Sequence, residues 1–476
     1  MSERVQHASF GRVMKNYLSD FKVLKETRSE YWGIQIINLL DCTIFFALLT
    51  IAAVFLSQDL GFSDPDAGYI VALFTASTTL FLFISGMMTD WLGIRRSIYI
   101  AMFAMLFLRA GVAVCGLVDT IPYRGIIVAV LFFLMAPFMA MMQTVFQAAN
   151  KRFTTKRSRS AGFTIWYLFM NIGATAGAFS IDIVRKVLEL PNSHIFTMGA
   201  ILAILSMLTT ILMVRSEKQL IGDDEIVVEE KKDENGVEIK RKNPIQILRE
   251  IVRESAFWKL AVLIILLLGA RAIFSYFYLL MPKYWIRTIG EGAAIGTLSA
   301  VNPILIVIGL ILFIPIANKF NLFKMLTYGA MVSSASLLIL VIPWQVFSSN
   351  IATAHYMMAL AFLVVFSIGE IIWSPKLSEY TAAVAPPGQE GTYLGFTMIP
   401  WFLAKTVVSL MSGHMLTKWS PEGIGKQMVE GTVGFWQQPA AMWLILSAVA
   451  IAGVLIAIAL KPWFIKGARW EIETVD

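Results

Sequence analysis

The chain has 476 residues, of which 57% are hydrophobic and 15% are charged, and its mean hydropathy is +0.70. These values lie outside the range of soluble domains, so the composition excludes a soluble globular protein and indicates a membrane protein. The net charge of +7 fits membrane topology and attraction to a lipid surface, and it requires no nucleic-acid partner.

The N-terminal 30 residues are polar and charged, so the sequence predicts no cleavable signal peptide. Their apolar residues fall on one helical face, which predicts an interfacial helix; a solvated tail is the alternative. Further along the chain, Cys42 and Cys115 each fall inside an apolar run and far apart, which favours packing roles over a disulfide.

Apolar runs long enough to cross a bilayer recur along the rest of the chain. A spanning helix needs about 20 mainly apolar residues, and continuous runs such as "AVLIILLLGA" are unlike the alternating strands of a barrel. The sequence therefore predicts an all-α membrane protein with twelve transmembrane helices. The predicted spans are 31–57, 66–88, 97–117, 125–148, 161–184, 195–215, 256–281, 295–317, 323–344, 352–375, 391–416 and 436–460.

Lysine and arginine gather in alternate loops, before the first span, after the second and fourth, and between the eighth and ninth. The positive-inside rule then predicts a multi-pass protein of the cell membrane, either the bacterial inner membrane or a plasma membrane, with both termini cytoplasmic. The opposite loops carry few cations, with Lys283, Arg287, Lys418 and Lys426 as exceptions.

The loop between spans two and three reads "GMMTDWLGIRR". It resembles the signature loop of the major facilitator superfamily, G-x-x-x-D-R-x-G-x-R-R, with Trp91 where a basic residue is usual. The matching residues are Gly86, Asp90, Gly93, Arg95 and Arg96. Gly86 would permit close helix approach, Asp90 would pair with arginines or cap a helix, and Gly93 would supply the turn. The loop is thus predicted to be a conformational latch.

Residues 216–253 are the one long hydrophilic interruption, and they divide the spans six and six. Alternation around Asn235-Gly236 predicts a small hairpin, and a solvated connector is favoured over a regulatory element. With the superfamily resemblance, this division implies two pseudo-symmetric six-helix bundles in a major facilitator fold, rocking around a midplane site. The expected domains are an N-terminal segment (1–30), a first bundle (31–215), the linker (216–253), a second bundle (254–462) and a cytoplasmic tail (463–476).

Three further stretches resemble signatures of the proton-dependent oligopeptide transporter family: "FTIWYLFMNIG" in span five, "AVNPILIVIGLILFIPI" in span eight and "GEIIWSPKLSEYTAAVAP" from span ten. The resemblance implies proton-driven transport of small peptides. Two departures point to a divergent member. Span one keeps an acid at Asp41 in "NLLDCTIFF" but lacks the usual E-x-x-E-R-F, and span four places Gln143 where a lysine is usual.

Ionisable side chains inside predicted spans are costly and are functional-site candidates by default. They are Asp41, Arg109, Arg271, Glu370 and Lys405. The resemblance assigns Glu370 to the substrate's amino terminus, and Lys405, Arg109 or Arg271 then holds its carboxylate. A structural Glu370–Lys405 salt bridge is the alternative.

Proton coupling or gating is assigned to Asp41, Arg271 and Arg109. Spans one and seven face each other in this fold, so Asp41 and Arg271 are expected to form a cross-bundle pair that protonation of the acid would release. Independent pairs within each bundle are an equally open alternative.

Polar and aromatic residues complete the expected substrate site, although each singly is more often a core or interface residue. They are Gln143, Tyr167, Asn171, Tyr276, Asn302 and Trp373.

The function predicted from these patterns is secondary active transport of small peptides or related zwitterions by alternating access, by proton symport. A facilitator or exporter of another organic solute is one alternative, and a non-transporting membrane sensor or scaffold is another. The four histidines show no metal spacing and there is no P-loop or nucleophile motif, so neither an enzyme nor a cofactor is expected. The expected partners are a small-molecule substrate, protons and membrane lipid; the sequence indicates no oligomeric state.

Overall fold

The computed structural model describes residues 21–155, 158–216, 253–317, 321–384 and 390–465, and within them the chain is helical, without strands. Nine of the described helices are long and apolar enough to cross a membrane, and the pair α9–α10, bent by 49°, makes a tenth. Helices α3 and α15, of 29 and 30 residues, are of similar length and complete the twelve.

The helices of the first half are α2 (Ser29–Gln58), α3 (Asp64–Leu92), α4 (Ile94–Leu117), α5 (Arg124–Arg152), α6 (Arg159–Asp182) and α7 (Ser193–Met213). Those of the second half are α9 (Ser255–Leu266) with α10 (Leu268–Leu279), α12 (Ile295–Ala317), α13 (Leu322–Ser336), α14 (Ile351–Val384), α15 (Glu390–Trp419) and α17 (Pro439–Ala459). Short helices are η1 (Phe21–Glu26), η2 (Ile183–Val187), α11 (Met281–Ile289), η3 (Leu337–Val341), η4 (Trp344–Val346), α16 (Ile424–Glu430), η5 (Phe435–Gln437) and α18 (Lys461–Ile465).

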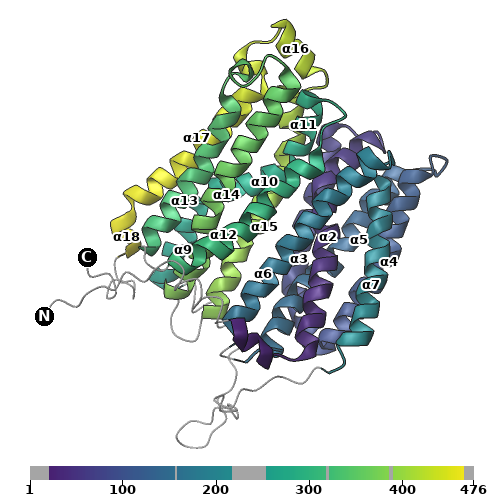
Figure 1. Ribbon diagram of the computed structural model, residues 1–476, viewed down its shortest axis with the longest axis vertical. Coiled ribbons are helices and arrows are strands. Elements are labelled where there is room, and N and C mark those ends of the chain that lie inside the picture. Colours follow the sequence, from purple (N-terminus) through teal and green to yellow (C-terminus); the bar gives the residue numbers. More distant parts are fainter. Residues whose placement is uncertain (1–20, 156–157, 217–252, 318–320, 385–389, 466–476) are drawn as a thin grey trace, which may run out of the picture.

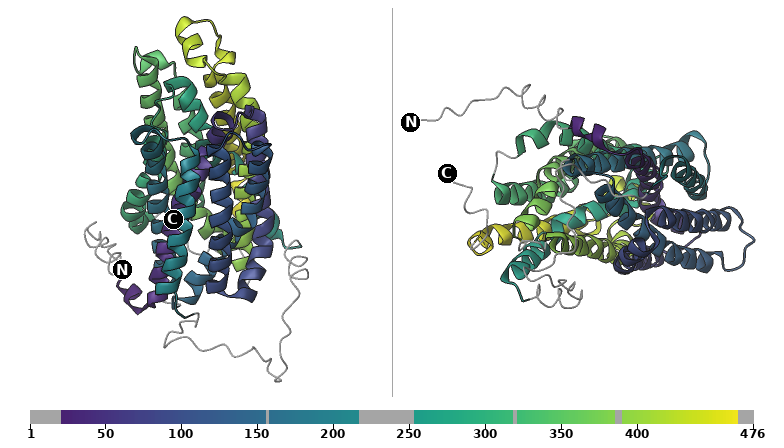
Figure 2. Two further views of the ribbon diagram at one scale, coloured as in Figure 1. Left: turned by 90° about the vertical axis from the view of Figure 1, so that its right-hand side faces the viewer. Right: turned by 90° about the horizontal axis from the view of Figure 1, so that it is seen from below.

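The helices pack into two bundles that follow the order of the chain (Figure 1), and the view along the bundles separates them (Figure 2, right). In the first, here the N-bundle, α2 packs on α6, α3 on α5 and α4 on α7. In the second, the C-bundle, the equivalent pairs are α10 on α15, α12 on α14 and α13 on α17. Because the pairing repeats with a shift of six helices, the predicted pair of pseudo-symmetric bundles is confirmed.

The bundles meet along two helix pairs, α3 with α15 and α6 with α12, and α2 also contacts α10 and α11. Glycines allow the close approach. A Cβ on Gly413 would lie 2.2 Å from the carbonyl oxygen of Asp64, and one on Gly296 would lie 2.1 Å from that of Ala178. Small residues at such crossings are typical of helix packing in membranes.

Two faces of the molecule are used below. The distal face is where α2 ends at Gln58 and α3 begins at Asp64, uppermost in Figure 1 near α16. The terminal face is the opposite one, where α2 begins at Ser29 and α17 ends at Ala459.

Two predicted elements differ from the structure. Pro375 was expected to end span ten, but it lies inside α14, which continues to Val384. A proline in a membrane helix is tolerated where neighbouring groups satisfy the freed backbone, and α13 packs along α14. Span seven is not one straight helix, because it bends at Leu267 between α9 and α10.

Other expectations concern segments at the edges of the described chain. Most of the predicted N-terminal interfacial helix and nearly all of the linker with its predicted hairpin lie outside the described residues. The part of the N-terminal segment that is described forms the short 3-10 helix η1. Cys42 and Cys115 are both free and buried, which confirms that they form no disulfide with each other.

Candidate functional site

A buried carboxylate lies midway along α14. The Nδ2 atom of Asn302, on α12, donates to Oε2 of Glu370 at 2.9 Å and to Oγ of Ser367 at 3.0 Å. Both Glu370 and Asn302 are buried. Asn302 therefore orients the carboxylate and satisfies one oxygen in a site with little water.

Two cations of the C-bundle lie at similar depth. Arg271 on α10 donates to Oγ of Ser374 at 3.4 Å, and its guanidinium carbon lies 5.6 Å from the centre of the Trp373 ring. Lys405 is buried near the middle of α15, and its Nζ lies 5.2 Å from the centre of the Phe45 ring on α2. The Lys405 ammonium thus makes a cation–π contact across the boundary between the bundles.

The N-bundle contributes an aromatic group to the same region. The hydroxyl of Tyr167 on α6 is close enough to interact electrostatically with Glu370 and Arg271, and these two charges also interact with each other. Asn171 donates to the carbonyl oxygen of Tyr167 at 2.8 Å one turn earlier on the helix. Helix α6 packs on α12, whose Asn302 bonds Glu370, so the phenol of Tyr167 and the charges of Glu370 and Arg271 lie near the boundary between the bundles.

Other predicted site residues lie elsewhere. The Nε1 of Trp373 donates to Oγ of Ser333 at 3.2 Å, so its ring packs in the C-bundle core while its face meets Arg271. Tyr276 is half-buried against the main apolar core. Gln143 lies half-buried on α5, without a contact that joins it to Glu370 in the described part of the chain.

Asp41 and Arg109 form a buried pair inside the N-bundle. The Nη2 atom of Arg109 on α4 lies 3.4 Å from Oδ1 of Asp41 on α2, and Nη1 donates to the carbonyl oxygen of Gly199 on α7 at 3.2 Å. A cross-bundle pair of Asp41 with Arg271 and a pair within the bundle were both left open by the sequence, and this structure shows the pair within the bundle because Asp41 faces α4. Arg271 interacts electrostatically with Glu370 of its own bundle and makes its hydrogen bond to Ser374.

The predicted latch lies at the terminal face and is only partly as expected. Gly93 has φ +81° and joins α3 directly to α4, which confirms its turn role. Among the described residues none lies within 4 Å of a Cβ built at Gly86, so the close approach expected there remains a prediction. Arg95 lies 5.9 Å from the Tyr99 ring centre, and Arg96 is exposed.

The side chain of Asp90 lies outside the described residues, so its predicted role as the acid of the latch remains a prediction.

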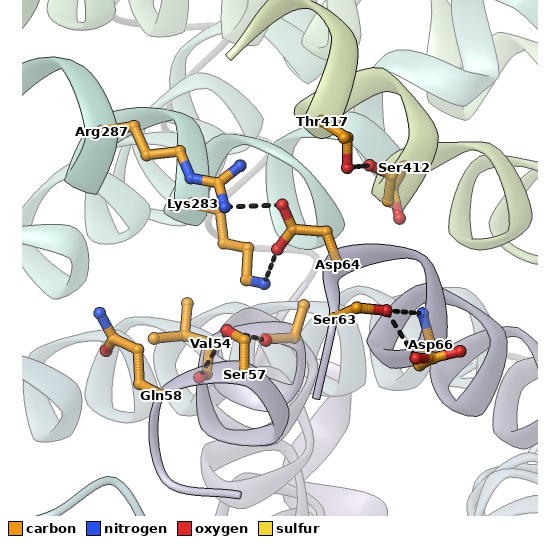
Figure 3. A network of polar contacts seen from close by, with 12 residues as sticks. Val54, Ser57, Gln58, Ser63, Asp64, Asp66, Lys283, Arg287, Ser412 and Thr417 are labelled. Carbon is orange, nitrogen blue, oxygen red and sulfur yellow. Dashed lines mark hydrogen bonds and ion pairs between the residues drawn. The ribbon is translucent and has the colours of Figure 1, made fainter. Parts of the chain in front are cut away.

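An ion network closes the distal face (Figure 3). Nζ of Lys283 and Nη2 of Arg287, both on α11, reach the two carboxylate oxygens of Asp64 at the start of α3, at 2.5 and 2.6 Å. Nη1 of Arg287 also donates to the carbonyl oxygen of Ser420 at 2.7 Å. One half-buried carboxylate of the N-bundle thus binds two cations of the C-bundle.

A second contact crosses the bundles at the same face. The carboxylate of Asp182, at the end of α6, accepts bonds from the backbone N–H groups of Gly296 and Thr297 at 2.8 and 2.7 Å. It also accepts from the Thr297 hydroxyl at 2.7 Å. Asp182 therefore caps the N-terminus of α12 from the other bundle.

These distal residues were not among the predicted site residues. Their signal in the sequence was the exception to the positive-inside rule, because Lys283 and Arg287 stand on the face where cations are rare. The structure accounts for the exception, since both cations face Asp64.

Comparisons with known proteins agree with this architecture. The sequence profile of the Major Facilitator Superfamily matches residues 34–409. A search of curated proteins finds no significant match.

Several solved structures are similar in fold. A peptide transporter in complex with alafosfalin has a TM-score of 0.68 at 14% identity, covering 92% of this chain and 95% of its own. A transporter of the proton-dependent oligopeptide (POT) family in complex with 5-aminolevulinic acid has a TM-score of 0.65 at 13% identity, covering 93% and 100%. A D-xylose–proton symporter has a TM-score of 0.67 at 12% identity, covering 90% and 96%. At these identities the likeness concerns the fold alone.

Proposed function

This chain belongs to the major facilitator superfamily, and from that premise we propose that it is a secondary active transporter of small peptides or related zwitterionic solutes, driven by protons. The observation that carries the proposal is the convergence of Glu370, Arg271 and Tyr167 between the two bundles. A substrate held there touches both moving parts, as alternating access requires.

The two ends of a zwitterion match the two kinds of charge at this site. A substrate ammonium is suited to Glu370, whose orientation is fixed by Asn302. A substrate carboxylate is suited to Arg271 and Lys405, which lie on α10 and α15 of the same bundle. In this assignment Arg271 and Lys405 of the C-bundle take over the role of the usual lysine on span four, where this chain has Gln143.

We infer which state of the transport cycle the structure represents from the contacts between the bundles. In this structure the Asp64 and Asp182 contacts join the two bundles at the distal face. We assign the terminal face to the cytoplasm and the structure to a state that opens inward. Reaching the outward-open state then requires the Asp64 and Asp182 contacts to break.

Proton coupling is assigned to Asp41 with Arg109. Neutralising Asp41 would leave the buried guanidinium without its carboxylate, which changes the packing of α2 against α4. The site proposal and the coupling proposal are separable, because Glu370 and Asp41 lie in different bundles.

The test is uptake of dialanine into proteoliposomes with an imposed proton gradient. Wild type is expected to accumulate free dialanine, Glu370→Gln to lose it by at least about tenfold, consistent with one charge-assisted hydrogen bond, and Glu430→Gln, at an exposed acid, to match wild type. N-acetylated dialanine should bind weakly to wild type and no more weakly to Glu370→Gln.

Equal losses of both peptides in Glu370→Gln would exclude an amine contact. Flux that ignores the gradient would favour a facilitator of another solute, and retained binding without flux would favour a sensor.

A further inference from the structure

A polar cavity of about 200 Å³ opens beside the ion network on the distal face. It lies between the end of α2, helix α11 and the segment that precedes α16. Its polar lining residues are Ser57, Gln58, Lys283, Arg287, Glu291 and Glu422. The Glu291 side chain is 75% exposed, so the cavity communicates with the solvent on this face. A water molecule takes about 30 Å³ in the liquid, so the cavity has room for a solute of amino-acid size.

The inner wall of the cavity carries cations with bonding capacity to spare. Lys283 and Arg287 share the single carboxylate of Asp64 (Figure 3). An ammonium has three donors and a guanidinium five, and only some of these are used by Asp64 and the Ser420 carbonyl. A second carboxylate can therefore bind here without displacing either cation.

The rim of the cavity carries acids. Glu291 accepts from Nε2 of Gln58 at 3.0 Å and lies 3.9 Å from Nη2 of Arg185. Glu422 is exposed and interacts electrostatically with Lys283. The cavity therefore has positive charge at its inner wall and negative charge at its rim.

The charged side chains that line the cavity balance. Two cations, Lys283 and Arg287, stand against two acids, Glu291 and Glu422. A solute with one net charge would upset this balance, whereas a zwitterion leaves it neutral and meets an opposite charge at each end.

We propose that this cavity is an entry site for free amino acids or small peptides. Their α-carboxylate binds Lys283 and Arg287, and their ammonium binds Glu291 or Glu422. The solute class rests on the proposed function, but the site is separate from Glu370. An arriving carboxylate shares the two cations with Asp64, so occupancy weakens the contact that holds the distal face shut.

The test is photolabelling of the full-length protein in liposomes with photoleucine, a free amino acid whose side chain carries a diazirine. Labelled positions are mapped by mass spectrometry. The expected result is labelling within 54–58, 286–291 or 422–423, unchanged in Glu370→Gln. N-acetylated photoleucine and photoleucine amide, which lack one charge each, should label these segments at least about tenfold less, because each loses a charge-assisted contact.

Variants test the rim acids. Glu291→Gln with Glu422→Gln should lower photoleucine labelling by a similar factor, whereas Glu430→Gln, an exposed acid of α16 outside the cavity, should leave it unchanged. Equal labelling by charged and N-acetylated probes, no labelling of these segments, or indifference to the double variant would each overturn the proposal. Because labelling needs no transport, these results stand apart from the dialanine uptake that tests the proposed function.

Discussion

The structure holds two ion networks that differ in place. Asp41 with Arg109 is buried within the N-bundle, whereas Asp64 with Lys283 and Arg287 is partly buried and lies between the bundles. The first joins helices that move together in a rocking transporter. The second joins helices that must separate when the distal face opens.

The difference indicates what each network stabilises: the fold of one bundle, or one conformational state of the protein. The helices joined by a pair inside one bundle stay together through the whole cycle, so removing that pair should appear mainly as lower stability of the fold. A network between bundles exists only while one face is shut, so its loss should appear as a shift between states. The predictions below test this division.

The largest effect is expected for Arg109→Gln, which leaves the Asp41 carboxylate buried without its cation. Removing one partner of a buried pair typically costs about 3–5 kcal/mol. We expect a large fall in the Tm of the purified protein. Arg287→Gln should lower the Tm much less, because Asp64 keeps its bond to Lys283.

The matched control is the double variant Asp41→Asn with Arg109→Gln, which removes both charges and should recover much of the lost stability. An equal Tm fall for Arg109→Gln and Arg287→Gln would contradict the division between the two networks.

A smaller effect is expected at two glycines with similar geometry. A Cβ on Gly177 would lie 2.1 Å from the carbonyl oxygen of Thr43, within the N-bundle, and one on Gly413 would lie 2.2 Å from that of Asp64, between the bundles. Overpacking costs about 1–3 kcal/mol. Gly177→Ala should therefore lower the Tm, whereas Gly413→Ala should open the distal face.

Opening is measured by thiol labelling of Val54→Cys, which lines the distal cavity, with Cys42 and Cys115 replaced by alanine. Gly413→Ala should raise the labelling rate and Gly177→Ala should not. The reverse pattern would show that the α3–α15 contact supports the fold rather than one state.

The sequence predicts the parts of the molecule that depend on local composition. Hydropathy placed the twelve helices, and the loop motif placed the turn at Gly93, because lipid and backbone geometry act on each segment alone. It did not predict the partner of Asp41, which depends on which face of α2 meets α4. Nor did it predict the continuation of α14 through Pro375, where neighbouring helices decide the outcome.

The smallest effect is expected from pH on the distal network. Burial would raise the pKa of Asp64, but Lys283 and Arg287 outweigh it and hold that pKa below its usual range. The ordinary pKa of an aspartate is about 3.9. A lowered folded-state pKa means that the charged carboxylate stabilises the folded protein at any pH above that ordinary value. This stabilisation is lost only as the pH falls through the folded-state pKa. The Asp64 carboxylate should therefore stay charged as the pH falls from about 7 to about 5.

Spin labels on the distal ends of α3 and α12 should therefore report an unchanged distance over that range, while transport can still vary with pH through Asp41 inside the N-bundle. A distance that lengthens on mild acidification would mean that another group titrates at the distal face. Glu291 and Glu422 face the network from the cavity rim, and His355 on α14 lies against Tyr284 of α11 with ring centres 5.9 Å apart. Replacing His355 with glutamine would then separate a histidine switch from the acids, because only the histidine gains a charge near neutral pH.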